Sequence, residues 1–502
     1  MSEPRSHPSG WSLVSLGDIG RLHCGQSPSV ANVNRVGKGT PYVTGPDHWD
    51  GSTLTADKWT TDPRRVVPDG CIFITVKGAG VGTLFPGIAC AIGRDVYAYE
   101  PGKGLSSKFV EHALRFQIGE VLRHAKGDIP GLSKDHILDH QMAIPSPQEQ
   151  RRIVAKIEEL FSDLDAGVAA LERVRANLKR YRAAVLKAAV EGRLTEEWRR
   201  QDPATEPAAK LLERILTERR AKWEQDQLRK FKEAGKTPPK GWKEKYEEST
   251  SESSVDLGAL PAGWCSAQIG MIADTSTGGT PSRARPDFFG GDVPWVKSGE
   301  LGDSVVSRTE ETISDAGLDN SSAKVFPAGT LCIALYGATV GKVGVLGIPA
   351  ATNQAVCAMF LPSGINTRFA FYYLISIRSK LVALGKGGAQ PNISNGIVRA
   401  TEFPIPPVAE QAEIVAEVDR RLSVADAAET QVEHALQRAA RLRQAILKRA
   451  FEGKLVPQDP LTSPADLPHD RMFSDEPRSG AAAALTAGRA LPPNRRRRSD
   501  RI

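Results

Sequence analysis

One stretch of about fifty residues occurs twice in this chain, and this duplication constrains the fold more than any other feature. Position 144 of the first copy (144–194) corresponds to position 405 of the second (405–455), and every later pair keeps that offset without a gap. Matching words include Pro145 with Pro406, Glu149-Gln150 with Glu410-Gln411, and Gly192-Arg193-Leu194 with Gly453-Lys454-Leu455. A repeat with so long a period indicates a duplicated domain and not a solenoid unit.

Each copy predicts one long helix. A proline, Pro147 or Pro407, stands at the start, where a missing N–H is tolerated. Gly192 and Gly453 end the two helices, with basic residues close by. About 45 residues at a rise of 1.5 Å each give a rod of roughly 65–70 Å. Such a length is typical of a coiled coil.

Apolar residues recur every seven positions in both copies, which predicts that the two helices pair. The predicted interface residues are Ile157, Leu164, Leu171, Leu178 and Val185 in the first helix, and Val418, Ala425, Val432, Ala439 and Ile446 in the second. A coiled-coil heptad has a second apolar position, and in the first helix Leu160, Val174 and Tyr181 occupy it. The alternative is that each helix packs only on its own domain. Isolated helices of this length need a partner to be stable, which favours pairing.

The net charge and the cysteine pattern limit which classes of protein this chain can belong to. A net charge of +7 and a pI near 9.0 permit a nucleic-acid partner without establishing one. The six cysteines are scattered with no CxxC or CxxH spacing, which indicates neither a zinc site nor a disulfide framework and fits a reducing cytoplasm. No signal segment or apolar run of eighteen residues stands out, so we expect a cytoplasmic chain that does not span a membrane.

The repeat divides the chain into six regions. They are a first globular domain (10–143), a first long helix (144–194), a linker (195–260), a second globular domain (261–404), a second long helix (405–456) and a basic tail expected to be disordered (457–502).

Local patterns predict elements inside these regions. The first domain contains β-like runs at Val66–Val67, Cys71–Val76 and Val96–Tyr99, followed by a helix at Ser107–His124. The linker predicts a charged helix at Thr205–Ala234, with Thr205 as its cap. We favour a solvated spacer for this helix, and the alternative is a docking element for another subunit.

The two globular domains share a framework of short words. Pro8-Ser-Gly-Trp11 matches Pro261-Ala-Gly-Trp264, Gly78–Gly82 matches Gly337–Gly341, and Pro130-Gly-Leu-Ser133 matches Pro391-Asn-Ile-Ser394. Between these landmarks the domains share little. We therefore expect two similar frameworks that carry different intervening stretches.

Catalytic motifs are not convincing anywhere in the chain. Gly78–Gly82 superficially suggests a dinucleotide loop, but Thr83-Leu-Phe-Pro86 follows in place of a helix, which predicts a turn between strands. The segment Gly337–Val343 is too short between its glycines for a phosphate loop and lacks the Ser or Thr that holds Mg²⁺. The nine histidines are scattered, and there is no persuasive metal-nuclease or methyltransferase motif.

The whole layout resembles the specificity (S) subunit of Type I restriction-modification enzymes. The resemblance covers about residues 10–457 and depends on the order of the repeated words: Pro-x-Gly-Trp opening each domain, Gly387-Gly-Ala-Gln390-Pro391-Asn392-Ile393-Ser394, and Glu-Gln followed by Ile-Val in each helix. Two features depart from the family. The first domain has Gly127-Asp-Ile-Pro130-Gly131-Leu132-Ser133 where the family often has a Gln-Pro-Asn form, and the linker is long.

The resemblance implies an α+β fold with two similar target-recognition domains, each followed by a long helix, and with the two helices packed as an antiparallel coiled coil. Each domain would read one half of a split, asymmetric site in double-stranded DNA. The helices would fix the spacer and dock two methyltransferase (M) subunits, with restriction/translocase (R) subunits completing the complex. This chain would be non-catalytic and bind no cofactor, while its partners would use S-adenosylmethionine, ATP and Mg²⁺.

Base and phosphate contacts need Arg, Lys, Asn or Gln side chains. The candidates are Lys77, Lys126, Lys134, Arg283, Arg285, Lys297, Lys342, Lys386, Gln390 and Asn392, of which we expect about half to touch DNA. Two other hypotheses remain at this point. The chain could be a non-catalytic coiled-coil adaptor that binds only proteins, or an enzyme with an unrecognised site.

Overall fold

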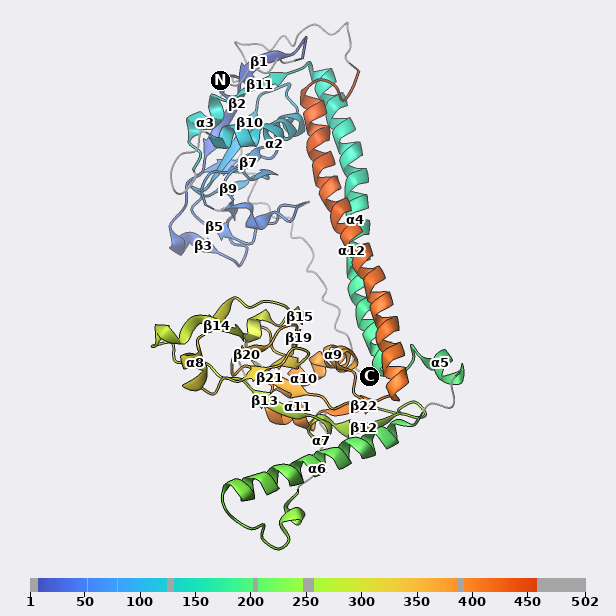
Figure 1. The fold of residues 1–502 in the computed structure, drawn as a ribbon. Coiled ribbons are helices and arrows are strands. Elements are labelled where there is room, and N and C mark those ends of the chain that lie inside the picture. Colours follow the sequence, from blue (N-terminus) through green and yellow to red (C-terminus); the bar gives the residue numbers. More distant parts are fainter. Residues whose placement is uncertain are drawn as a thin grey trace. The chain divides into compact units, whose positions relative to one another are not determined.

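The computed structural model describes residues 8–51, 53–78, 80–123, 131–201, 206–246, 257–385 and 392–457 of the 502-residue chain. Its contacts divide the chain into two compact units, 1–170 with 435–502, and 171–434. Each unit therefore combines one globular domain with parts of both long helices (Figure 1).

The described residues of the first globular domain form eleven short strands, and strands that are close in the sequence often belong to different sheets. The strands are β1 (Ser12–Ser15), β2 (Gly20–Cys24), β3 (Val33–Asn34), β4 (Thr40–Val43), β5 (Trp59–Thr60), β6 (Val66–Val67), β7 (Ile72–Thr75), β8 (Leu84–Pro86), β9 (Cys90–Ile92), β10 (Val96–Pro101) and β11 (Gln141–Ile144). They form sheets of order β1-β11, β2-β10-β7-β8 and β3-β5-β4-β9-β6. The three predicted β-like runs are confirmed as β6, β7 and β10.

The α-helices of the first domain, as far as it is described, are α1 (Leu16–Ile19), α2 (Ser107–Arg123) and α3 (Lys134–Leu138). Helix α2 matches the predicted Ser107–His124 as far as it is described, since residue 124 lies outside the described ranges. Its buried face, which includes Phe109, Val110 and Leu114, packs with β7 and β10 in one apolar cluster.

The second globular domain repeats this plan. Its strands are β12 (Cys265–Gln268), β13 (Asp274–Thr277), β14 (Phe289–Val296), β15 (Ser304–Val306), β16 (Glu311–Ile313), β17 (Val325–Phe326), β18 (Leu331–Ala334), β19 (Val343–Leu346), β20 (Ala350–Thr352), β21 (Val356–Phe360) and β22 (Glu402–Ile405). They form sheets of order β12-β22, β13-β21-β18-β19-β15 and β16-β14-β20-β17. Its helices are α7 (Ile269–Ile272), α8 (Asp315–Asp319), α9 (Thr367–Ser376), α10 (Arg378–Leu384) and α11 (Asn395–Ala400).

One strand distinguishes the central sheets of the two domains. In the second domain β15 pairs in parallel with β19 and adds a fifth strand. In the first domain the corresponding sheet ends at β8. The framework is thus duplicated while its edge differs, as the uneven similarity of the two sequences predicts.

The two repeated stretches form the long helices α4 (Pro147–Val190) and α12 (Val408–Phe451). Both end before a glycine with positive φ, +69° at Gly192 and +68° at Gly453, a conformation that favours glycine at the end of a helix. The predicted start at Pro147 and the predicted glycine stops are confirmed.

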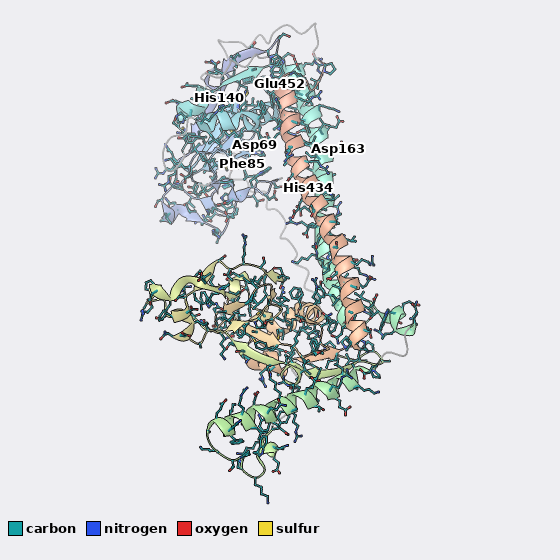
Figure 2. The ribbon with its side chains drawn as sticks, viewed as in Figure 1. Asp69, Phe85, His140, Asp163, His434 and Glu452 are labelled. Carbon is teal, nitrogen blue, oxygen red and sulfur yellow. The ribbon has the colours of Figure 1, made fainter. Side chains whose placement is uncertain are left out.

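Within the first unit, the beginning of α4 lies against the end of α12. Arg443 forms an ion pair with Asp165, and its guanidinium carbon lies 4.6 Å from the centre of the Phe161 ring. Leu447 and Ala450 belong to the same buried cluster as Ile153 and Ile157. Figure 2 shows Glu452, just beyond α12, beside the first domain.

Within the second unit, the end of α4 lies against the beginning of α12. Arg182 forms ion pairs with Asp426 and Glu429, both at 2.6 Å. Val185 and Ala189 share a buried cluster with Ile414 and Val418. The beginning of each helix therefore meets the end of the other, which is the predicted antiparallel arrangement.

Burial along the helices agrees with the first predicted apolar position of the heptad better than with the second. Ile157, Val185, Val418, Ala425, Val432 and Ala439 are buried, while Leu164, Leu171, Leu178 and Ile446 are half-buried. At the second seam position Leu160 is half-buried, but Val174 and Tyr181 are 44% and 42% exposed. The prediction that these last two side chains are buried is wrong, because only one seam position is covered in that part of α4.

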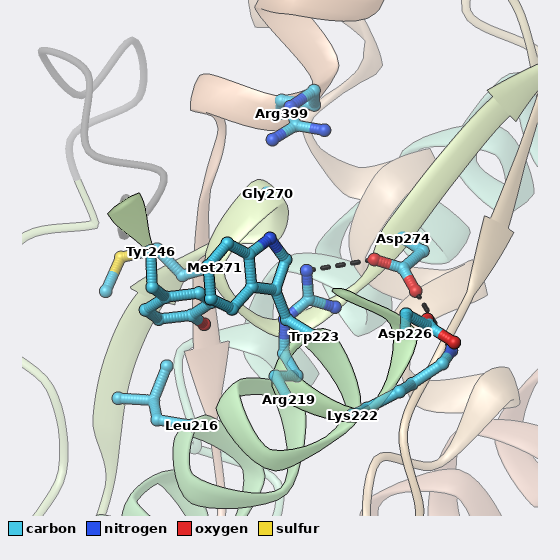
Figure 3. Close-up of a pocket in the computed structure, with 10 residues that line it drawn as sticks. All are labelled: Leu216, Arg219, Lys222, Trp223, Asp226, Tyr246, Gly270, Met271, Asp274 and Arg399. Atoms are coloured by element: carbon cyan, nitrogen blue, oxygen red, sulfur yellow. Dashed lines mark hydrogen bonds and ion pairs between the residues drawn. The ribbon is translucent and has the colours of Figure 1, made fainter. Parts of the chain in front are cut away.

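The linker contains α5 (Glu196–Gln201) and α6 (Ala208–Glu233). Ala208, Leu211 and Ile215 are buried in the main apolar cluster of the second domain, so the prediction of a solvated spacer is wrong for the first half of α6. Further along, Arg219 and Lys222 contact Asp274 at 2.9 and 3.5 Å, beside a pocket that Trp223 also lines (Figure 3). Thr205, the predicted cap, lies outside the described residues.

No helix in the described ranges combines the length and the hydropathy needed to cross a membrane.

Candidate nucleic-acid interface

A glycine-rich hairpin projects from the central sheet of each domain. It joins the antiparallel strands β7 and β8 in the first domain, and β18 and β19 in the second. Gly78 and Gly82 have φ of +84° and +83°, and Gly337 and Gly341 have +92° and +76°, a region that L side chains rarely adopt. The predicted turn between strands is confirmed for Gly78–Gly82.

A second loop lies against the base of each hairpin. In the first domain, Lys77 and Gly131 form an isolated antiparallel bridge, and Tyr336 and Asn392 form its equivalent in the second. The following residues reinforce this contact. The amide of Leu132 donates to the carbonyl of Val76 at 2.9 Å, and the amide of Ile393 donates to that of Leu335 at 2.7 Å.

The recurrence of an apolar residue followed by serine in this second loop has a local physical explanation. Leu132 and Ile393 are 3% and 0% exposed and anchor their loops in the domain core. The next residue caps a short helix: Ser133 Oγ accepts from the His136 amide at 3.2 Å, and Ser394 Oγ accepts from the Ile397 amide at 3.1 Å. The anchor and the cap fix the backbone and leave the polar residues beside them exposed.

The Pro-x-Gly-Trp motif at the start of each domain contacts the Glu-Gln motif at the start of the long helix that follows that domain. Trp11 Nε1 donates to Glu149 Oε1 at 3.2 Å. Trp264 Nε1 donates to Glu410 Oε2 at 2.8 Å. The neighbouring glutamines also correspond, because Gln150 and Gln411 each donate to the carbonyl of the proline five residues before, at 3.0 Å. These buried contacts explain why Pro-x-Gly-Trp and Glu-Gln recur together.

In the first domain, the structure brings two of the three predicted contact residues to the hairpin. Lys77 lies at its base, and Lys134 begins α3 directly after the capping serine. Both side chains are exposed, and within the described part of the chain neither has an acidic partner. Lys126 lies outside the described residues.

In the second domain, Lys342 directly follows the hairpin glycine and Asn392 lies across the bridge from Tyr336. Asn392 is exposed and Lys342 is half-buried. Lys386 and Gln390 lie outside the described residues. The two described residues therefore occupy the same end of the sheet as Lys77 and Lys134 do in the first domain.

The other three predicted cations of the second domain are engaged in ion pairs. Glu311 contacts Arg283 at 2.8 Å and Lys297 at 3.0 Å, and Lys297 also contacts Glu310 at 2.8 Å. Hydrogen bonds from Arg283 and then Lys297 lower the pKa of Glu311, while Glu310 and Glu311 raise that of Lys297. Arg285 pairs with Asp287 at 2.7 Å. Much of the charge on these three side chains is therefore compensated within the domain.

Comparison with known proteins agrees with the duplicated plan. The Type I restriction modification DNA specificity domain matches residues 8–173 and again residues 261–438, which together make up more than half of the chain. This chain belongs to the family of Type I restriction-modification specificity subunits.

Individual relatives span most of this specificity subunit. It is 26% identical over 459 residues to the Type I restriction enzyme EcoDI specificity subunit of Escherichia coli, with 90% of each chain covered. It is 27% identical over 387 residues to the EcoKI specificity subunit of Escherichia coli K12, covering 74% of this chain and 70% of that one. A solved structure described as the structural basis underlying complex assembly and conformational transition of the type I R-M system shares the fold. Its TM-score is 0.60 at 20% identity, over 90% of this chain and all of that one.

Family membership confirms the α+β class with two target-recognition domains and long helices, and it confirms that the specificity subunit is a non-catalytic member of its system. The two globular domains are therefore named the first and second target-recognition domains.

Several residues beside the hairpin of the second target-recognition domain escaped the sequence analysis. Arg378 Nε donates to the carbonyl of Gly341 at 2.9 Å, and the same guanidinium forms an ion pair with Asp303. Thr339 Oγ1 donates to the carbonyl of Ser298 at 2.7 Å. These partners are 37 to 75 residues apart, and only the folded sheet brings them together.

A polar cluster near the hairpin of the first target-recognition domain was also missed. His48 Nδ1 lies 3.1 Å from Asp57, and Lys58 Nζ donates to Thr44 Oγ1 at 3.3 Å. The cluster adjoins the hairpin through Pro46, whose Cγ would lie 3.1 Å from a Cβ built on Gly80. These residues fall where the two copies share little sequence, so the repeat gave no signal for them.

Proposed function

We propose that this specificity subunit reads one bipartite, asymmetric site in double-stranded DNA, with each target-recognition domain contacting one half. The two domains share a framework, which supports the idea that both bind DNA in the same way. They differ in the stretches between the shared motifs, which supports the idea that they recognise different half-site sequences. Half-site separation in such proteins follows from protein dimensions.

Reciprocal packing is the observation that carries the proposal. In the first unit, the first target-recognition domain rests on the beginning of α4 and the end of α12, through the cluster that holds Trp11, Ile153 and Leu447. In the second unit, the second domain rests on the beginning of α12 and the end of α4, through the cluster that holds Trp264, Ile414 and Val185. Each domain is therefore mounted on both helices, as a spacer between two readers requires.

The helices supply the spacer and, by inference, the docking surface for two methyltransferase subunits that use S-adenosylmethionine to methylate adenine. Restriction/translocase subunits that use ATP and Mg²⁺ complete the proposed cytoplasmic complex. A helix of 44 residues spans about 66 Å, roughly two turns of B-DNA at about 34–36 Å per turn. The exposed polar faces of α4 and α12 remain accessible for such partners.

The proposed DNA contacts start from the hairpins and the loops beside them. Lys77 and Lys134 in the first domain and Lys342 and Asn392 in the second reach exposed or half-exposed positions there. Lys126, Lys386 and Gln390 stay in the proposal from the sequence alone. Arg283, Arg285 and Lys297 would contact phosphates only by sharing or exchanging their acidic partners, so we rank them below the others.

Replacing the first target-recognition domain by a second copy of the other tests this function. A hybrid with residues 261–404 in place of 10–143 keeps Trp264 opposite Glu149, so the hydrogen bond between domain and helix is conserved, while the transplanted copy loses its contact with α6. Because the helices are antiparallel, the two identical readers should face inverted half-sites. The methylome of cells that carry the hybrid and its methyltransferase should show the second half-site repeated as an inverted pair.

Two results would contradict the proposal. Methylation by the hybrid at the original asymmetric site would show that the first domain does not read DNA. Methylation that is independent of either domain, with intact assembly of the complex, would favour the protein-only adaptor. Co-purification of the methyltransferase subunits with the hybrid serves as the control for folding and assembly.

A further inference from the structure

The hairpin of the second target-recognition domain is held by a charged contact that has no counterpart among the described residues of the first. Arg378 begins α10 and reaches two groups at once, the carbonyl of Gly341 and the carboxylate of Asp303. Asp303 in turn accepts from the amide of Val343 at 3.2 Å, and its own amide donates to the carbonyl of Val343 at 2.9 Å. Both ends of the contact are thus tied to the last residues of the hairpin.

Asp303 adopts an unusual backbone conformation to make these contacts. Its φ is +62°, and it is the sole non-glycine residue with positive φ in the described ranges. Such a conformation is strained for a residue with a side chain and persists where the surroundings enforce it, often at functional sites. Asp303 directly precedes β15, the edge strand that has no counterpart beside β8 in the described part of the first domain.

In the first domain the atoms nearest to the matching hairpin glycine all belong to one apolar side chain. A Cβ built on Gly82 would lie 2.8 Å from Leu122 Cδ1, and a Cβ built on Gly341 would lie 2.9 Å from Arg378 Cγ. Val382 Cγ2 would lie 3.2 Å from the Cβ on Gly341, so each glycine meets an apolar helix side chain, Leu122 or Val382, and Gly341 meets Arg378 in addition. Leu122 can pack against the hairpin but cannot donate a hydrogen bond to it.

We propose that Arg378 and Asp303 are positioning residues that preset the hairpin Gly337–Gly341, so that Lys342 and Asn392 discriminate the second half-site from a fixed backbone. The proposal rests on the proposed function. A preset hairpin reduces the ordering cost of binding and raises the penalty for a mismatched base edge. The first half-site, read beside an apolar-packed hairpin, does not depend on this contact.

Three substitutions separate the parts of the contact. Arg378→Met removes the ion pair and the donor to Gly341. Arg378→Lys keeps a charge for Asp303 but removes the planar Nε donor. Asp303→Asn removes the ion pair while tolerating positive φ, since asparagine is among the residues enriched there. Arg368→Met is the matched control, because it removes an ion pair with Asp419 from the neighbouring α9 without touching the hairpin.

The test measures affinity of the complex with its methyltransferase subunits for three duplexes: the cognate site, the site with its second half changed, and the site with its first half changed. We expect Arg378→Met and Asp303→Asn to lower discrimination at the second half about five- to tenfold and to leave the first half unchanged. Arg378→Lys should retain part of the discrimination, and Arg368→Met all of it. Hydrogen exchange at Gly341 and Val343 should be faster in Arg378→Met and Asp303→Asn.

Two outcomes would overturn the assignment. Wild-type discrimination at the second half in both Arg378→Met and Asp303→Asn, despite faster exchange, would show that the contact does not serve recognition. Loss of affinity for all three duplexes in proportion to unfolded protein would show a structural role alone. If the wild type itself fails to discriminate at either half-site, the proposed function fails together with this inference, and that result is distinct from the other two.

Discussion

The indole of Trp264 donates to the carboxylate of Glu410 at 2.8 Å, and Trp11 makes the same bond to Glu149 at 3.2 Å in the first target-recognition domain. The two copies differ in what else satisfies the carboxylate. Glu410 also accepts from Thr195 at 2.6 Å and pairs with Arg199, both from the segment after α4. Among the described residues, Glu149 has Trp11 as its side-chain donor and no cation. The joint between domain and helix is therefore better supported in the second unit.

This asymmetry predicts unequal effects of removing the two indole nitrogens. Trp11→Phe should destabilise the chain by about 1–3 kcal/mol, because Glu149 is left buried without its donor. Trp264→Phe should cost about 0.5–1.5 kcal/mol, because Glu410 keeps its other partners. Urea unfolding of the two variants measures the difference. A larger loss for Trp264→Phe would contradict this explanation.

Helix α6 is predicted to stabilise the second target-recognition domain. Leu211 is 4% exposed within the main cluster of that domain, so Leu211→Ala should cost about 2–5 kcal/mol. Leu228, on the same helix, is 45% exposed, and Leu228→Ala should change stability by less than about 0.5 kcal/mol. Chemical unfolding compares the two. Equal, small effects would restore the idea of a spacer helix that is independent of the domain.

His112 should make the first unit sensitive to mild acid. Its ring packs against Phe161 at 5.8 Å, and Nδ1 is buried with no partner in the described part of the chain. Burial lowers the pKa of His112 from 6.5, and the nearby Arg115 and Lys108 act in the same direction against Glu111 and Glu158. Because the unfolded chain then binds the proton more readily, stability is full above about pH 6.5 and falls as the pH drops toward the folded pKa.

Unfolding free energies between pH 7.5 and 5 test this titration. The wild type should lose stability across that range more steeply than His112→Phe, which cannot take up the proton. Identical slopes for the two proteins would rule out His112 as the source of the pH dependence.

The length of the paired helices should set the spacer between the half-sites. Seven residues inserted after Val168 in α4 and after Glu429 in α12 keep the heptad phase and add about 10.5 Å to each helix. At about 3.4 Å per base pair, the methylated motif should gain a spacer of about three base pairs with unchanged half-sites. An insertion in α4 alone should abolish activity, because each domain rests on both helices and the two helices would then differ in length by about 10.5 Å. An unchanged spacer in the double insertion would contradict the role of the helices.

The features that the sequence predicted well are local or repeated. The helix starts, the glycine stops and the hairpin turns depend on residues close in the chain, and each occurs twice. The exposure of Val174 and Tyr181 was missed because a heptad does not reveal how much of the second seam its partner covers. The burial of α6 was missed because Leu211 and Leu228 are indistinguishable in a sequence. The contact of Arg378 with Asp303 was missed because those residues are 75 positions apart and the contact has no copy where the first domain is described.

The central claim is that two unlike target-recognition domains read one split site. The most direct measurement is the methylome of cells carrying the complete system, compared with cells that lack this gene alone. The account predicts one methylated motif that depends on the gene, with two different half-sites separated by a fixed unread spacer. A continuous motif, or methylation that is unchanged when the gene is absent, would contradict it.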